Sequence, residues 1–189
     1  QLAALRDAAP AAGQLLADLD RRTPAVHPGH RHLVLIPCRL YDATHSSLPR
    51  PVCPVRNKIF FNGNPHKRGF QWKISLTVRT YDGAVLRVGN PFPGSVHDVQ
   101  DVSDSTAPHI ADLGYIGARM DVMCGVKRPR GGALTADETR YNACLSAWRG
   151  VAEGVNGRLK CQFPRLRFWT GRDDGSVLHA AWLLAAVAH

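Results

Sequence analysis

The sequence has no long hydrophobic run and no recognisable leader. Its longest apolar segment, AAWLLAAVA near the C-terminus, is about half the ~18 residues that a membrane span requires. The N-terminus shows no basic region followed by an apolar one, and the chain starts at Gln1, as a fragment or a processed product does. We therefore expect no membrane partner and an intracellular protein, nuclear in a eukaryote and cytoplasmic in a bacterium.

Paired cysteines are also missing. The five cysteines include no CxxC pair, and their number is odd. Such spacing matches neither a zinc site nor a disulfide framework, so reduced thiols are the simpler interpretation.

Acidic residues are scarce beside basic ones. The chain has 15 Asp and Glu against 24 Lys and Arg, which gives a net charge of +9. A basic surface suits a polyanion, and nucleic acid is the usual one. A basic protein without a specific partner has the same charge, so composition leaves both interpretations open.

The hydrophobic pattern predicts a mixed α/β fold. The apolar run 33–42 predicts a buried strand that ends on the acid Asp42. In the segment 71–80, QWKISLTVRT, apolar and polar residues alternate, which predicts a half-buried strand. Asp82-Gly83 then supplies the turn of a hairpin. The remaining expected elements are a returning strand at 84–88, a short helix at 96–103, short strands at 109–115 and 120–127, and a final helix from about 176.

Two helical segments frame this pattern. Residues 1–20 predict one or two short helices broken by Pro10 and Gly13. Thr135 and Glu138 form a capping-box signal that opens a long helix at 136–160. We divide the chain into an N-terminal helical and loop segment, 1–32, and one domain, 33–189.

Three acids stand on three of these elements. Asp42 and Asp112 end predicted strands, and Glu153 lies in the long helix. Carboxylates that converge repel one another unless a cation lies among them. Hard oxygen ligands of this kind suit Mg²⁺ or Mn²⁺.

The long helix carries a polar stripe beside its apolar one. Arg149, Glu153, Asn156 and Lys160 recur at helical spacing. A plain solvated helix face gives the same pattern. Glycines at 150, 154 and 157 favour close approach by another backbone or by DNA, since each costs roughly 1 kcal/mol in a helix interior; the alternative is a helix broken at this point.

Six sequence blocks, in order, resemble those of the DDE transposases of the PIF/Harbinger and IS5-like group. They cover nearly all of residues 33–189. The blocks are Asp42-Ala43-Thr44-His45 with Arg50-Pro51, Phe61-Asn62-Gly63 with Lys67-Arg68-Gly69, Pro93-Gly94-Ser95-Val96-His97-Asp98, Ala111-Asp112-Leu113-Gly114-Tyr115, Arg149-x3-Glu153 continuing to Gly157-Arg158-Leu159-Lys160, and the terminal LLAAVAH.

The resemblance implies an RNase H-like fold: a five-stranded mixed sheet, three antiparallel strands and then parallel strands, flanked by helices. It implies a catalytic and metal-binding triad of Asp42, Asp112 and Glu153. Two ions, Mg²⁺ or Mn²⁺, would be bound, with Asp42 bridging both. The reaction would be hydrolysis of DNA phosphodiesters followed by strand transfer.

Further expectations concern partners. Basic residues would contact phosphates of transposon ends and target DNA, although any single one is equally well explained as solvated surface. Asp98 and the neighbouring His97 are expected to support the site rather than to hold metal directly. A separate DNA-binding protein and a homo-oligomer are also expected. The predicted DNA contacts are Arg149, Lys160, Lys67, Arg68, Arg128 and Arg130.

Two other functions fit the same sequence. One is a domesticated, catalytically inactive transposase that keeps the fold and binds DNA or protein. The other is an RNase H-like nuclease that cuts nucleic acid without strand transfer.

Overall fold

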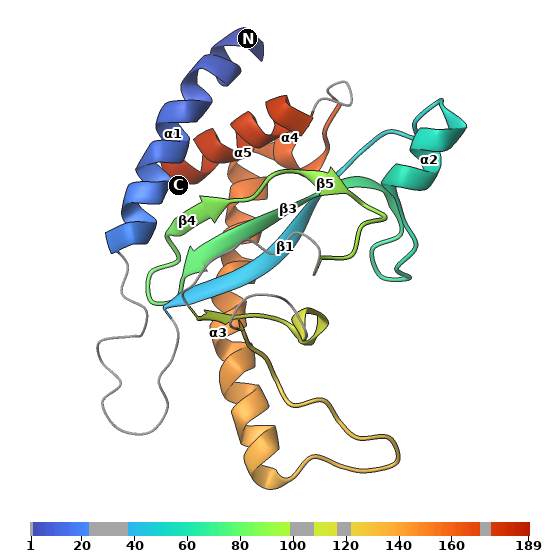
Figure 1. Ribbon diagram of the computed structural model, residues 1–189, viewed down its shortest axis with the longest axis vertical. Helices are drawn as coiled ribbons and strands as arrows, with labels where there is room; N and C mark the ends of the chain where they lie inside the picture. Colours follow the sequence, from blue (N-terminus) through green and yellow to red (C-terminus); the bar gives the residue numbers. More distant parts are fainter. Residues whose placement is uncertain (1, 23–37, 99–107, 117–121, 171–174) are drawn as a thin grey trace.

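The computed structural model describes residues 2–22, 38–98, 108–116, 122–170 and 175–189 (Figure 1). The predicted helix at 96–103, Pro37 and the boundary proposed between 32 and 33 lie wholly or largely outside them. In chain order the elements are α1 (Leu2–Arg22), β1 (Arg39–Ser47), α2 (Pro54–Phe60), β2 (Phe61–Asn62), β3 (Gly69–Arg79), β4 (Val85–Val88), β5 (Phe92–Pro93), β6 (His109–Ile110), the 3₁₀ turn η2 (Leu113–Tyr115), β7 (Val122–Met123), α3 (Ala136–Gln162), α4 (Pro164–Arg167) and α5 (Gly175–Ala188).

The described strands form one mixed sheet. Its order is β2-β3-β1-β6-β7, and β4 and β5 also pair with β3. The pairs β4–β3 and β3–β1 are antiparallel, whereas β1–β6 and β6–β7 are parallel. Three antiparallel strands followed by parallel strands, with helices against the sheet, confirm the predicted mixed α/β architecture.

The strand β1 differs from its prediction. It continues to Ser47, because all of its residues from Arg39 on pair with β3. Asp42 therefore lies inside the strand, opposite Leu76, rather than at its end. The polar residues beyond Asp42 are accommodated by hydrogen bonds: the Ser46 hydroxyl, fully buried, donates to the Leu166 carbonyl at 2.6 Å.

The β3–β4 hairpin is confirmed. Gly83 has a φ of 76° in the turn, and the Asp82 carboxylate accepts a hydrogen bond from the Ala84 N–H at 3.1 Å. The predicted half-burial of β3 is wrong, since the polar side chains of Ser75 and Thr77 are as buried as their apolar neighbours. β3 pairs with β1 on one side and β4 on the other, and its Ser75–Thr77 face is covered as well as its apolar face.

The long helix α3 begins at the predicted capping box and runs unbroken to Gln162. It crosses behind β1 and β3 in Figure 1 and packs on both. The apolar stripe supplies Val155 and Leu159 to the main core. The helix is not broken at its glycines, and nothing approaches within 4 Å of a Cβ placed at Gly150 or Gly157.

The N-terminal segment is one continuous helix, not two short ones. The helix α1 passes through Pro10 and Gly13 and packs against α5 and β4 (Figure 1). Ala12 and Leu16 are buried in the same core as α5. Tertiary packing here outweighs the cost of an internal proline. None of the helices in the described ranges is long and apolar enough to cross a membrane.

Candidate active site

Sheet register brings the first two acids to the same level. Leu40 of β1 pairs in parallel with Ile110 of β6. Asp42 and Asp112 each lie two residues beyond this pair. Adjacent strands are ~4.8 Å apart, so the two acids stand side by side on neighbouring segments. The short strand β6 then stops, and Asp112 caps η2 by accepting a hydrogen bond from the Leu113 N–H at 2.7 Å.

The third acid, Glu153, lies on α3 and is linked to Asp112 by Arg149 of the same helix. The Arg149 guanidinium lies 3.3 Å from a carboxylate oxygen of Asp112 and 3.6 Å from one of Glu153. The side chains of Asp112 and Glu153 are 48% and 66% exposed, so both acids face solvent at the rim of the sheet. Arg149 thus neutralises two acids that come from different elements.

Asp42 has a different environment. Its carboxylate is half-buried, and burial raises its pKa to about 6, while the nearby charges of Lys67 and Arg149 act in the opposite direction. Glu153 is close enough to raise the pKa of Asp42 through its negative charge. All three predicted acids therefore meet in one electrostatic neighbourhood.

Asn156 is a site residue whose role the sequence does not reveal. Its side-chain N–H donates to Asp42 Oδ2 at 3.0 Å, and its own Oδ1 is buried without a hydrogen-bond partner. The signal was present in the polar stripe, where Asn156 follows Glu153 by three residues on the same helix face. The partner strand could not be read from that pattern.

The donor set fits a hard cation. It consists of three carboxylates and an unpartnered amide oxygen, which are the ligand types that Mg²⁺ and Mn²⁺ take in proteins. Within the described ranges, no three acidic, histidine or cysteine side chains are spaced as a ready-made metal site. Arg149 is the cation between Asp112 and Glu153 in this arrangement.

The predicted phosphate contacts fall into two groups. Lys160 is half-buried beside Asp42, and its pKa is lowered to about 8 by burial first and then by the charges of Lys67 and Arg167. Lys67 and Arg68 are exposed in the loop before β3. Arg128 and Arg130 lie instead in the loop that leads into α3, at the end of the helix remote from Lys160 (Figure 1).

Asp98 lies away from the three acids. Its carboxylate forms an ion pair of 2.8 Å with Lys73 of β3, and it follows the exposed His97. In the ion pairs and hydrogen bonds of the described residues, Asp98 has no contact with Asp42, Asp112 or Glu153, and its supporting role stays a prediction.

Comparison with known proteins identifies the family. The model of the DDE superfamily endonucleases matches residues 41–173, which is more than half of the chain. The chain belongs to the DDE superfamily of endonucleases. The match spans Asp42, Asp112 and Glu153, and the family is one of transposases and nucleases with an RNase H-like fold.

A curated relative supports this assignment. The chain is 28% identical over 146 residues to a protein of Microchaete diplosiphon described as a probable transposase for insertion sequence element IS702. The aligned region covers 70% of this chain and 51% of the relative, so the chain spans about half of that protein's length. No solved structure gives a significant match.

Proposed function

We propose that this DDE endonuclease domain cuts DNA phosphodiesters in a metal-dependent reaction and joins the resulting 3′ end to a target. The observation that carries the proposal is the convergence of Asp42, Asp112 and Glu153 around Arg149. Asp42 and Asp112 stand level on neighbouring segments of the sheet, and Glu153 of α3 is linked to Asp112 through Arg149.

Each side chain has a distinct task in this proposal. Asp42, Asp112 and Glu153 would hold two divalent ions, Mg²⁺ or Mn²⁺. When bound, such ions supply activated water and charge stabilisation for in-line displacement at phosphorus. Asn156 orients the Asp42 carboxylate through its hydrogen bond. Arg149 balances the negative charge of Asp112 and Glu153.

Lysines beside the acids would bind the DNA backbone. The positive charge of Lys67 lowers the pKa of both Lys160 and Asp42. The negative charge of Asp42 raises the pKa of Lys160. An anion bound beside such a half-buried lysine offsets its positive neighbours and stabilises its charged form. A DNA phosphate beside Asp42 provides that anion, and Arg128 and Arg130 would contact DNA from the loop that precedes α3.

The direct test is nicking of supercoiled plasmid with Mg²⁺, with Mn²⁺ and with EDTA. We expect metal-dependent nicking by the wild type and a loss of at least about 100-fold in Asp42→Asn and Glu153→Gln. Asp137→Asn is a matched control, because it removes one acid at the start of the same helix, far from the site. Wild type as inert as both variants would contradict an enzyme and favour a domesticated binding module.

Strand transfer needs a second assay. An oligonucleotide with a free 3′-hydroxyl is incubated with plasmid and metal, and joined products are detected by amplification across the junction. Joined products that disappear in Asp42→Asn support a transposase. Nicking without any joined product would reduce the activity of this domain to that of a nuclease.

A further inference from the structure

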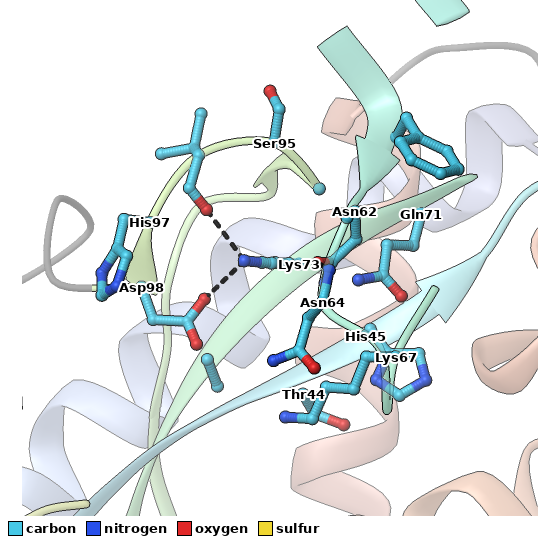
Figure 2. Close-up of a pocket in the computed structure, with 15 residues that line it drawn as sticks. Thr44, His45, Asn62, Asn64, Lys67, Gln71, Lys73, Ser95, His97 and Asp98 are labelled. Atoms are coloured by element: carbon cyan, nitrogen blue, oxygen red, sulfur yellow. Dashed lines mark hydrogen bonds and ion pairs between the residues drawn. The ribbon is translucent and has the colours of Figure 1, made fainter. Parts of the chain in front are cut away.

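A hollow lies along β1 next to the acids and shares Lys67 with them. Its volume is about 300 Å³, and its walls come from β1, β3, the loop after β2 and the segment 94–98 (Figure 2). Ala43 and His45 of β1 line it. Successive strand residues point to opposite faces, so Ala43 and His45 lie on the face opposite Asp42, which faces α3. Thr44, which also lines the hollow, lies on the face of Asp42. The strand is a wall shared by both sites.

Hydrogen-bond donors dominate this hollow. Asn62 Oδ1 accepts from the Asn64 N–H at 2.9 Å, and Asn64 Oδ1 accepts from the His66 N–H at 2.9 Å. Both amide oxygens are therefore engaged in the loop, and the two side-chain NH₂ groups remain for a ligand. Gln71 is only 3% exposed, yet its Nε2 has no hydrogen-bond partner. A buried donor left unpaired is costly and calls for an acceptor.

The charges around the hollow are mainly positive. Lys67 lines it with an exposed ammonium group, and Lys73 enters it from β3. Lys73 bonds to Asp98 and to the Val96 carbonyl, both at 2.8 Å, as the dashed lines in Figure 2 show. Asp98 offsets Lys73, and the charge of Lys67, which also acts on Asp42, faces the hollow, where an anion can bind.

The pKa of His45 responds to the same positive charges. Burial, followed by the charges of Lys160, Lys67 and Lys73, lowers the pKa of His45 to about 4, so its imidazole is neutral at pH 7. Three lysines gather around one histidine here, and the cost of bringing them together falls when an anion binds.

Backbone packing fixes the shape of the hollow. Gly94 lies so close to the chain that a Cβ there would be 2.5 Å from the Phe60 carbonyl oxygen. Its N–H donates to the Gln71 carbonyl at 2.9 Å. The loop carrying Ser95 is thus held against the strand residue whose side-chain amide is unpartnered.

We propose that this hollow binds a phosphate group of the DNA strand that enters the acid site, through Lys67 and the side-chain amides of Gln71 and Asn64. The proposal rests on DNA being the substrate. An array of amide donors with a lysine matches phosphate oxygens, which accept and do not donate. The shared wall of β1 places the bound phosphate beside the acids but outside their cluster.

The test measures DNA binding in EDTA, so that it does not depend on cutting. Fluorescence anisotropy follows a labelled single strand and a labelled duplex over a range of salt. We expect Lys67→Gln to weaken binding by about 3- to 10-fold and to reduce the slope of log K against log salt by about 1. Arg87→Gln is the matched control, an exposed arginine on β4, and it should change affinity by less than about twofold.

Gln71→Leu gives a sharper readout because it separates binding from folding. The substitution removes an unpaired buried amide at similar volume, so we expect a higher melting temperature together with weaker DNA binding. Asn64→Ala, in the exposed loop, repeats the binding measurement should Gln71→Leu fold poorly. A Lys67→Gln variant and an amide variant that bind DNA like Arg87→Gln would overturn the proposal.

Two further outcomes separate this inference from the proposed function. A mononucleotide that binds as tightly as the DNA strand would assign the hollow to free nucleotides and overturn the proposal. Loss of DNA binding in Lys67→Gln and Gln71→Leu, in a protein that never nicks DNA, would support the phosphate site while contradicting the enzyme. Normal DNA affinity in these variants, in a protein that nicks DNA, would contradict the phosphate site while supporting the enzyme.

Discussion

The Asn156 side chain donates a hydrogen bond of 3.0 Å to Asp42 Oδ2, joining the C-terminal third of α3 to the middle of β1. The other Asn156 atom, Oδ1, is buried and unpartnered on the same side chain. One amide therefore both fixes the orientation of a candidate ligand and presents a further oxygen near it.

This contact predicts that Asn156→Ala weakens metal binding and nicking together. Removing the hydrogen-bond partner of a metal ligand costs typically about 10- to 100-fold in metal affinity or activity. Mn²⁺ binding measured by electron paramagnetic resonance provides a readout independent of DNA. Asn142→Ala is the control, since the side-chain amide of Asn142, on the same helix, hydrogen-bonds to the backbone of Val126 rather than to an acid. Equal Mn²⁺ affinity in Asn156→Ala and wild type would exclude this role.

Burial of Asp42 predicts a pH-dependent loss of stability. Its folded pKa of about 6 lies above the unfolded value near 3.9, so the folded state binds more protons between these values. The free energy of unfolding should therefore fall as the pH rises from about 4 to about 6, when no divalent metal is present. Asp42→Asn should flatten this dependence and raise stability at pH 7 by about 1–3 kcal/mol. Urea denaturation in EDTA at several pH values measures it, and a slope unchanged by Asp42→Asn would refute the assignment.

The position of Arg149 predicts that lysine cannot replace it. A guanidinium presents several N–H groups in a planar fork and reaches Asp112 and Glu153 at once, whereas an ammonium is a compact point charge. We expect Arg149→Lys and Arg149→Ala both to reduce nicking by about 10-fold or more. Plasmid nicking at saturating Mg²⁺ tests this, with Arg140→Lys, near the start of α3, as the control. Full activity in Arg149→Lys would show that charge alone suffices.

The buried hydroxyl of Ser46 predicts a stability effect remote from the acids. It donates to the Leu166 carbonyl at 2.6 Å and accepts from the Trp182 indole N–H at 3.2 Å. Ser46→Ala leaves both groups unpaired in the core, so the free energy of unfolding should fall by about 1–3 kcal/mol. Ser47→Ala, one residue on and less buried, should change it by less than about 0.5 kcal/mol. Chemical denaturation followed by circular dichroism compares the two.

Local patterns predicted the parts of the fold that depend on local physics. The capping box at Thr135 and the helical stripe gave α3, and the two-residue period with Asp82-Gly83 gave the hairpin. The three acids could be chosen because carboxylates on separate elements, in blocks resembling a known family, stood out. Their common neighbourhood required the pairing of β1 with β6, which no local pattern contains.

The errors share one physical cause. The end of β1 is decided by pairing with β3, so polar residues after Asp42 extend the strand although the apolar run stops. The continuity of α1 through Pro10 is decided by packing on α5. The unpartnered amides of Asn156 and Gln71 become visible only once their surroundings are known. Long-range contacts overrule local preference in each case.

The pairing of β1 has a mechanical consequence for the site. Asp42 is set in a strand paired with β3 along its whole described length, so its backbone can move only if the sheet itself deforms. Asp112 caps a short 3₁₀ turn, and the Glu153 side chain extends from a helix surface and is 66% exposed. The backbone at Asp42 is therefore the most constrained of the three. A change in the spacing of the acids would come from movement at Asp112 and Glu153.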